Sequence, residues 1–213
     1  MSGTDAAAVP ASRRGRAGGD TAARILDAAL GSFAERGYEA TSLDALAAGL
    51  EVRKQTILYW YPSKDALLDA VIDRVAADLT DALEAALARA GQGWQRVEAV
   101  VRAVFRLAAR RPELLGLVRE IGRLGPPAAT RLTGAMEPLV DRASQFLQAE
   151  MDAGRMRLHS PRLLLVAIYS TVIGMVTEED VLRAVGEEPS VRSLVRRRAE
   201  LLDLLRSALL VGA

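Results

Sequence analysis

A short segment in the first third of the chain carries the side chains best suited to chemistry. Residues 53–56 read Arg-Lys-Gln-Thr, and residues 59–61 read Tyr-Trp-Tyr. The only two lysines of the chain, Lys54 and Lys64, both lie in this segment. Arginine and lysine bind guanine edges, glutamine binds adenine, and a threonine methyl group contacts thymine. A helix that begins with such residues and ends in aromatic residues is suited to the major groove of DNA.

Two short helices separated by a tight break are predicted to position this segment. The first has an apolar face, is capped by Thr41 or Ser42, and ends near Gly49. The second spans about residues 53–61. A stabilising helix over about residues 21–36 precedes both. This order is the helix-turn-helix arrangement, in which the second helix of the pair reads base edges.

The rest of the chain is also predicted to be helical, because alanine, leucine and arginine dominate it and strand-like alternation is absent. A long helix begins after Ser63 and joins two domains. Further helices are expected over about residues 94–110, 112–124, 128–152, 161–177 and 190–210. We therefore predict an all-α fold of about nine helices. It comprises a disordered arm (1–19), a three-helix DNA-binding domain (20–64) and a second helical domain (65–213).

Composition argues against several other classes of protein. The chain has no cysteine and one histidine, His159, which argues against disulfides and zinc sites. It shows no glycine motif that cradles phosphate and no nucleophile pattern, so we expect no enzyme, catalytic residue, metal or cofactor. The start lacks the apolar core of a secretory signal, and residues 163–176 are too short for a membrane span. We predict a soluble cytoplasmic protein without membrane contact.

An ordered set of residues in the first third of the chain matches one known pattern. The set comprises Ile25-Leu26-Asp27-Ala28-Ala29, Phe33, Gly37-Tyr38, Ala40-Thr41-Ser42, Leu46-Ala47, Val52, Thr56, Ile57, Tyr59, Tyr61, Pro62, Ser63-Lys64 and Ala66-Leu67-Leu68. By these residues the segment from about 23 to 68 resembles the N-terminal domain of the TetR (tetracycline-repressor-like) family of bacterial transcriptional regulators. The resemblance implies that the helix at 53–61 enters the major groove.

The same resemblance implies which side chains meet DNA. The predicted contact residues are Thr41, Ser42, Arg53, Lys54, Gln55, Thr56, Tyr59, Trp60 and Lys64. Those at 53–56 would meet bases or nearby phosphates, and the others mainly the backbone. Trp60 fits either packing or DNA contact. The arm residues Arg13, Arg14 and Arg16 either follow the DNA backbone, enter a minor groove, or do nothing specific.

The resemblance further implies that residues 65–213 bind a small-molecule effector and form a homodimer. The helices near 160–177 and 190–210 are apolar enough either to fill the core of one chain or to pair with a second copy as a four-helix bundle. The resemblance favours the pairing. Polar residues among apolar neighbours are candidates to orient the effector: Arg119, Gln145, Tyr169 and Thr171.

Two positions depart from the family pattern, and the first is Leu58, where the family often has an aromatic residue before Tyr59. Glu51 stands in the turn, where the family usually has glycine. A residue other than glycine is strained at positive φ, so either Glu51 carries that strain or the turn has a different shape. The predicted function is a repressor that binds a palindromic operator and releases it when an effector binds. The alternative, which Glu51 favours, is a helical adaptor with a degenerate DNA-binding head.

Overall fold

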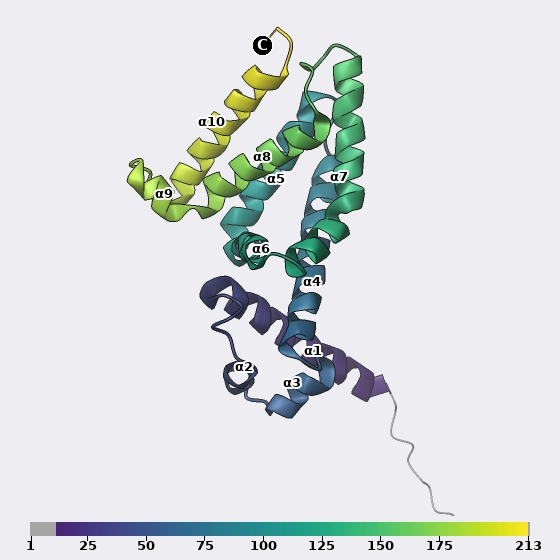
Figure 1. The fold of residues 1–213 in the computed structure, drawn as a ribbon, viewed down its shortest axis with the longest axis vertical. Coiled ribbons are helices and arrows are strands. Elements are labelled where there is room, and N and C mark those ends of the chain that lie inside the picture. Colours follow the sequence, from purple (N-terminus) through teal and green to yellow (C-terminus); the bar gives the residue numbers. More distant parts are fainter. Residues whose placement is uncertain (1–11, 213) are drawn as a thin grey trace, which may run out of the picture.

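The chain folds into helices joined by short connections (Figure 1). The computed structural model describes residues 12–212, with side chains from residue 20 onward. The helices are α1 (Ser12–Arg36), α2 (Leu43–Gly49), α3 (Lys54–Trp60), α4 (Lys64–Leu87), α5 (Trp94–Arg110), α6 (Pro112–Leu124), α7 (Ala128–Asp152), α8 (Pro161–Thr177), α9 (Glu179–Ala184) and α10 (Val191–Leu209). Over this range, no helix is long and apolar enough to cross a membrane.

Two parts of the fold are visible in Figure 1. The helices α1, α2 and α3 form one end, and α5 to α10 form the other. The long helix α4 runs from the first part into the second, with α7 beside it. Ser63 caps α4 by accepting a hydrogen bond from the backbone N–H of Ala66 at 3.0 Å. This start and the other boundaries from α2 to α8 confirm the sequence-based prediction closely.

The start of α1 and the presence of α9 differ from the prediction. Helix α1 begins at Ser12, so the part of the expected disordered arm from residue 12 to residue 19 is helical instead. Extending an existing helix costs little, since each added residue gains a hydrogen bond without a new nucleation step. Residues 1–11 of the arm lie outside the described part. The six-residue helix α9 was also missed, because fewer than two turns show no apolar periodicity, and the described chain therefore has ten helices.

A single apolar cluster extends from the first part of the fold into the second. Phe33 of α1, Ile57 of α3 and Leu67 of α4 are fully buried in it. The same cluster contains Leu117 and Ile121 of α6. Burying a side chain of this size stabilises a fold by about 1.5–3 kcal/mol. The cluster crosses the predicted domain boundary at residue 64, so α1 is packed directly against α6.

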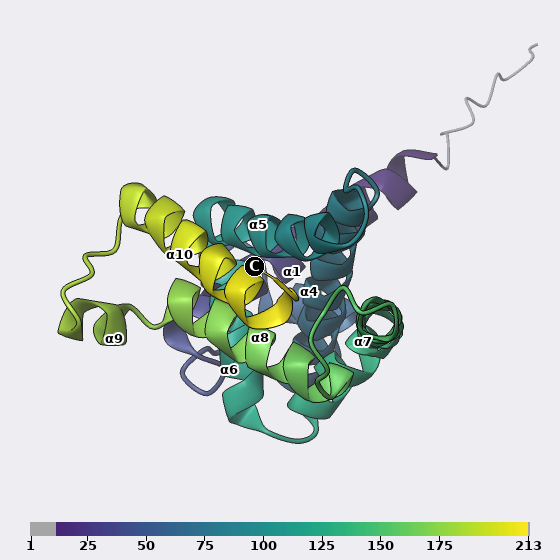
Figure 2. The same ribbon diagram turned by 90° about the horizontal axis from the view of Figure 1, so that it is seen from above.

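Two smaller clusters hold the second part together. Val101 and Phe105 of α5 pack with Val172 of α8 and Leu201 of α10. Leu147, Met151 and Met156 form the third cluster at the end of α7. Met156 also forms an isolated antiparallel bridge with Leu210, which ties the α7–α8 connection to the end of α10. The three elements α5, α8 and α10 therefore form one packed layer (Figure 2).

An ion pair between buried Glu150 and exposed Arg155 closes the end of α7. The carboxylate of Glu150 accepts hydrogen bonds from Nε and Nη2 of Arg155, at 2.7 and 2.8 Å, and Glu150 is only 7% exposed. Its backbone oxygen also accepts from the N–H groups of Arg155 and Met156. The hydrogen bond from Arg155 holds the pKa of Glu150 below its ordinary value, although burial opposes this shift.

This pair predicts a pH-dependent contribution to stability. A lowered folded pKa contributes stability above the ordinary glutamate pKa of about 4.3, and that stability is lost as pH falls through the folded pKa. We expect Glu150→Gln to lower the free energy of unfolding by about 1 kcal/mol near pH 7, and by less at about pH 3. Urea unfolding at both pH values measures this. The exposed Glu200→Gln is the control, and an equal loss at both pH values would show that charge is not the cause.

Candidate DNA-binding surface

The turn between α2 and α3 is built by the backbone, with Glu51 at its centre. The N–H of Val52 donates to Ala47 O at 3.0 Å, and the N–H of Glu51 donates to Ala48 O at 3.2 Å. These two bonds form the Schellman motif that ends many helices. Its left-handed position falls on Glu51, whose φ is +57°, the one positive φ at a non-glycine residue among those described. The turn therefore keeps the shape that glycine usually allows, and Glu51 carries the strain.

Helix α2 begins at a side-chain cap. The Oγ of Ser42 accepts a hydrogen bond from the backbone N–H of Ala45 at 3.1 Å, which confirms Ser42 as the cap. Thr41, the other candidate, is only 2% exposed, and its Oγ1 donates toward Gly37 O at 2.9 Å and Ser32 O at 3.2 Å. The Thr41 hydroxyl is therefore turned into the protein, and contact of Thr41 with DNA stays a prediction. That hydroxyl joins the end of α1 to α2.

Helix α3 is anchored by one residue and open on its outer face. Ile57 is fully buried, whereas Arg53, Gln55 and Tyr59 are exposed. Tyr59 is 78% exposed and its ring meets that of Trp60 edge to face, with 5.1 Å between ring centroids. The predicted basic, amide and aromatic side chains thus lie together on an outward-facing helix. Thr56 is half-buried behind them.

The two lysines of the segment are both held by contacts within the protein. Lys54 Nζ lies 2.8 Å from Asp44 Oδ2, a solvent-exposed pair that links α3 to α2. Lys64 Nζ lies 4.2 Å from the centroid of the Tyr38 ring and donates to Glu39 O at 3.3 Å. The Tyr38 hydroxyl donates to Asp65. Burial, followed by this hydrogen bond, raises the Tyr38 pKa, so Tyr38 stays neutral beside Lys64 at the edge of the surface.

The residues that build this surface match a known family. The sequence model for bacterial regulatory proteins of the tetR family matches residues 25–71. Over 169 residues, which are 79% of each protein, the chain is 26% identical to the HTH-type transcriptional regulator RutR of Escherichia coli. Over 112 residues, 47% of this chain and 60% of the other, it is 37% identical to the HTH-type transcriptional repressor Rv3405c of Mycobacterium tuberculosis. Residues 25–71 are therefore similar to the DNA-binding domain of the TetR family, within a longer stretch similar to HTH-type regulators.

By these likenesses the protein is a DNA-binding transcriptional regulator, and its α2–turn–α3 unit is the helix-turn-helix. The whole fold is also similar to solved structures. A transcriptional regulator from Saccharomonospora viridis, whose crystal structure contains choline, superposes with a TM-score of 0.73 at 18% identity. That likeness covers 91% of this chain and 99% of the other, so it includes the second part of the fold as well as the DNA-binding end.

The four residues predicted to orient an effector lie on α6, α7 and α8, and each has its own surroundings. Arg119 Nε forms an ion pair with Glu178 Oε1 at 2.9 Å, and Gln145 is exposed on α7. Tyr169 is half exposed on α8, and the Thr171 hydroxyl donates to Ala167 O at 2.8 Å. That these four residues orient an effector stays a prediction. Helix α8 turns much of its surface outward, and its polar atoms are satisfied locally or face solvent.

Three other residues place polar or polarisable atoms inside the second part of the fold. The Thr80 hydroxyl lies 3.7 Å from Met136 Sδ, between α4 and α7. The Ser144 hydroxyl on α7 is the one buried side-chain oxygen or nitrogen without a hydrogen-bond partner among the described residues. No sequence signal distinguishes these residues, because serine and threonine are ordinary in helices and only packing shows which ones face inward.

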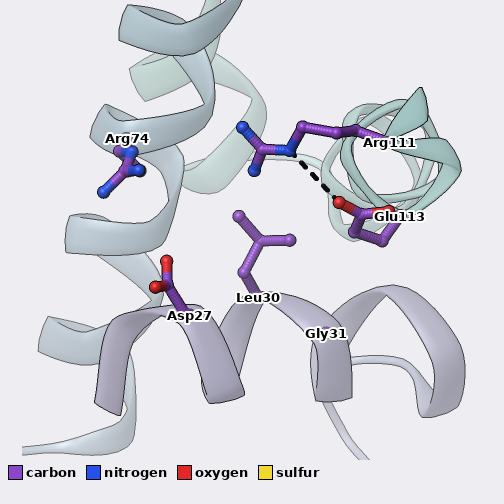
Figure 3. A pocket seen from close by; sticks show the side chains of 6 residues that line it. All are labelled: Asp27, Leu30, Gly31, Arg74, Arg111 and Glu113. Atoms are coloured by element: carbon purple, nitrogen blue, oxygen red, sulfur yellow. Dashed lines mark hydrogen bonds and ion pairs between the residues drawn. The ribbon is translucent and has the colours of Figure 1, made fainter. Parts of the chain in front are cut away.

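A cavity of about 310 Å³ lies where α1 meets α4 and α6 (Figure 3). We call it the junction cavity, and it is lined by Asp27, Leu30, Gly31, Arg74, Arg111 and Glu113. Arg111 donates to Asp78 at 2.6 Å and to Glu113 at 3.2 Å, while Arg74 donates to the same Asp78 at 2.9 Å. The bond to Asp78 is the main cause that raises the Arg111 pKa. The arginines of the junction cavity are therefore already neutralised by carboxylates.

The strain at Glu51 generates a stability prediction. A residue with a side chain costs roughly 1–2 kcal/mol in the left-handed conformation. Glycine avoids this strain, but part of the gain is lost because glycine has greater freedom in the unfolded chain. We expect Glu51→Gly to raise the free energy of unfolding by about 0.5–1 kcal/mol in urea titrations. Glu200→Gly, in the exposed interior of α10, is the matched control and should lower it by about 1 kcal/mol. Destabilisation by both changes would argue against a left-handed Glu51 in solution.

Proposed function

We propose that this protein is a repressor that binds a palindromic operator as a homodimer and releases it when a small molecule binds. The observation that carries the proposal is the outer face of α3. Arg53, Gln55 and Tyr59 are exposed on it, and buried Ile57 fixes the helix to the core. Because the helix-turn-helix keeps its Schellman turn despite Glu51, a degenerate DNA-binding head has no structural support. We place the protein in the cytoplasm, where operator DNA is accessible.

The contacts with DNA divide into two groups. Arg53 and Gln55 carry free guanidinium and amide groups that suit guanine and adenine edges. Lys54 belongs to the same group, and meeting DNA requires it to exchange Asp44 for a base or phosphate. The Tyr59 hydroxyl, the exposed Ser42 hydroxyl and Lys64 suit phosphates, which position the protein without reading sequence. Thr56 and Trp60 lie close enough to this face to complete the surface.

The homodimer proposal rests on apolar side chains left in solvent. Leu163 and Val166 on α8 are 70% and 58% exposed. Val191, Val195 and Leu204 on α10 are exposed as well, and only Val172 of α8 is buried. The two helices lie side by side in both views (Figures 1 and 2). A second copy that packs α8 and α10 against the same helices buries this surface in a four-helix bundle and sets the spacing of two half-sites.

The effector is proposed to bind between α4 and α7. The Thr80–Met136 contact joins these two helices, and the unpartnered Ser144 hydroxyl is buried on α7. A ligand that prefers one arrangement of these helices shifts the equilibrium toward it and thereby changes DNA affinity. A change in helix arrangement reaches the DNA-binding end directly, since α4 begins at Lys64 and α6 packs directly on α1. Choline is the molecule bound in the S. viridis protein, and it does not identify the effector of this chain.

Operator binding tests the first part of this proposal. We expect the double substitution Arg53→Ala and Lys54→Ala to weaken binding to duplex DNA from the gene's own upstream region by at least about tenfold, since each good base contact is worth about 1–3 kcal/mol. Fluorescence anisotropy at fixed salt measures the change, and circular dichroism checks the fold. Arg157→Ala, an exposed arginine at the opposite end of the molecule, should bind like the wild type. Wild-type affinity after both head substitutions would refute the role of α3.

Sedimentation tests the homodimer. We expect the wild-type protein at micromolar concentration to sediment as a dimer of the 22.8 kDa chain. Leu163→Glu combined with Val166→Glu should yield monomers, because like charges would face each other in a desolvated interface. Ala88→Glu, exposed at the end of α4, introduces a charge away from α8 and should leave the dimer intact. A monomeric wild-type protein would exclude the proposed assembly.

A further inference from the structure

A positively charged groove lies along the outer side of α4 and α5, separate from the DNA-binding surface and from the junction cavity. We call it the arginine groove. It encloses about 180 Å³ and is lined by Ala82, Ala85, Arg89, Ala103, Arg106, Leu107 and Arg110. Ala82 and Ala85 lie on α4, and Arg89 lies in the turn that follows it. The α5 residues recur at intervals of three and four, so they share one face of that helix. No carboxylate lines the groove.

The three arginines of the groove have no partner among the described residues. Arg89, Arg106 and Arg110 are exposed, and no carboxylate lies within 4 Å of their guanidinium groups. Other arginines on α4 and α5 differ in this respect. Arg74 on α4 pairs with Asp78, and Arg102 on α5 pairs with Glu98. The groove therefore concentrates positive charge that the protein itself leaves uncompensated.

The floor of the groove is apolar. Ala103 is 3% exposed and Leu107 is half-buried, whereas the arginines stand at the rim. Small alanine side chains on both helices leave the space that the long arginine side chains surround. The volume lies below the roughly 300 Å³ of a site for a drug-sized ligand. It therefore suits one charged group together with a small apolar or ring portion that rests on Ala103 and Leu107.

We propose that the arginine groove binds a small phosphate-bearing molecule. A phosphate monoester carries about −1.5 to −2 charges at neutral pH and three terminal oxygens, which allows it to engage more than one guanidinium fork. A single carboxylate forms paired hydrogen bonds with one guanidinium group and leaves the other arginines without a partner. The junction cavity does not compete for such a ligand, because Asp78 and Glu113 already occupy its arginines. This site does not depend on the DNA contacts of α3.

Calorimetric titration of the full-length protein with inorganic pyrophosphate, at constant ionic strength near 0.15 M, tests the proposal. We expect one binding site per chain. Arg106→Ala with Arg110→Ala should weaken binding at least about tenfold, and Arg89→Ala should weaken it severalfold. Arg106→Lys with Arg110→Lys should give an intermediate loss, because lysine keeps the charge but lacks the fork. Arg157→Ala is the control for an exposed, unpaired arginine elsewhere and should bind normally.

Three results would overturn the assignment. Equal weakening by Arg157→Ala would show general attraction to cationic surface rather than a groove. Citrate binding as tightly as pyrophosphate at matched ionic strength would show that phosphate is not selected. Loss of binding to a duplex of unrelated sequence in the Arg106 and Arg110 double variant, with pyrophosphate binding unchanged, would assign the groove to the DNA backbone instead. Thermal unfolding of each variant confirms that these exposed substitutions leave the fold intact.

Discussion

The apolar cluster that joins α1, α4 and α6 is the constraint on which the rest of the molecule depends. Phe33 and Ile57 hold the reading helix α3 against α1, and the same cluster continues to Leu117 and Ile121 of α6. A densely packed core does not deform gradually, so α1 and α6 move together or exchange between discrete arrangements. The end that reads DNA is thus part of the same core as the helices that would sense a ligand.

This continuity explains why local sequence signals predicted the elements well but not their mutual roles. Ser63 and Pro112 mark helix starts through hydrogen bonding and backbone restriction within a few residues, and both were readable. Thr41 and Ser42 are equally good caps in sequence. Only the packing of α1 against α2 decides that Thr41 is buried and Ser42 exposed. The face of α3 was predictable because it lies within one short helix.

Sites that several distant helices build were beyond the reach of the sequence. Tyr169 and Thr171 looked like pocket residues because they are polar within an apolar helix, but α8 turns that apolar surface outward. Ser144, by contrast, looked unremarkable and is the hydroxyl left without a partner. Glu51 is an intermediate case. The sequence left open whether Glu51 is strained or the turn has a different shape, and the structure shows a glycine-type turn with a strained glutamate.

The arginines show most clearly how position rather than composition determines function in a chain of net charge +1. Arg131 and Arg111 form ion pairs with carboxylates on α4. These pairs join helices and neutralise the charge of both arginines. Buried Arg197 donates to the carbonyl of Met175 near the end of α8, and desolvation lowers its pKa. Positive charge remains available to a partner only where carboxylates are missing. Arg53 on the reading helix and the arginine groove both meet that condition, so a nearly neutral protein can still offer two separate surfaces to anions.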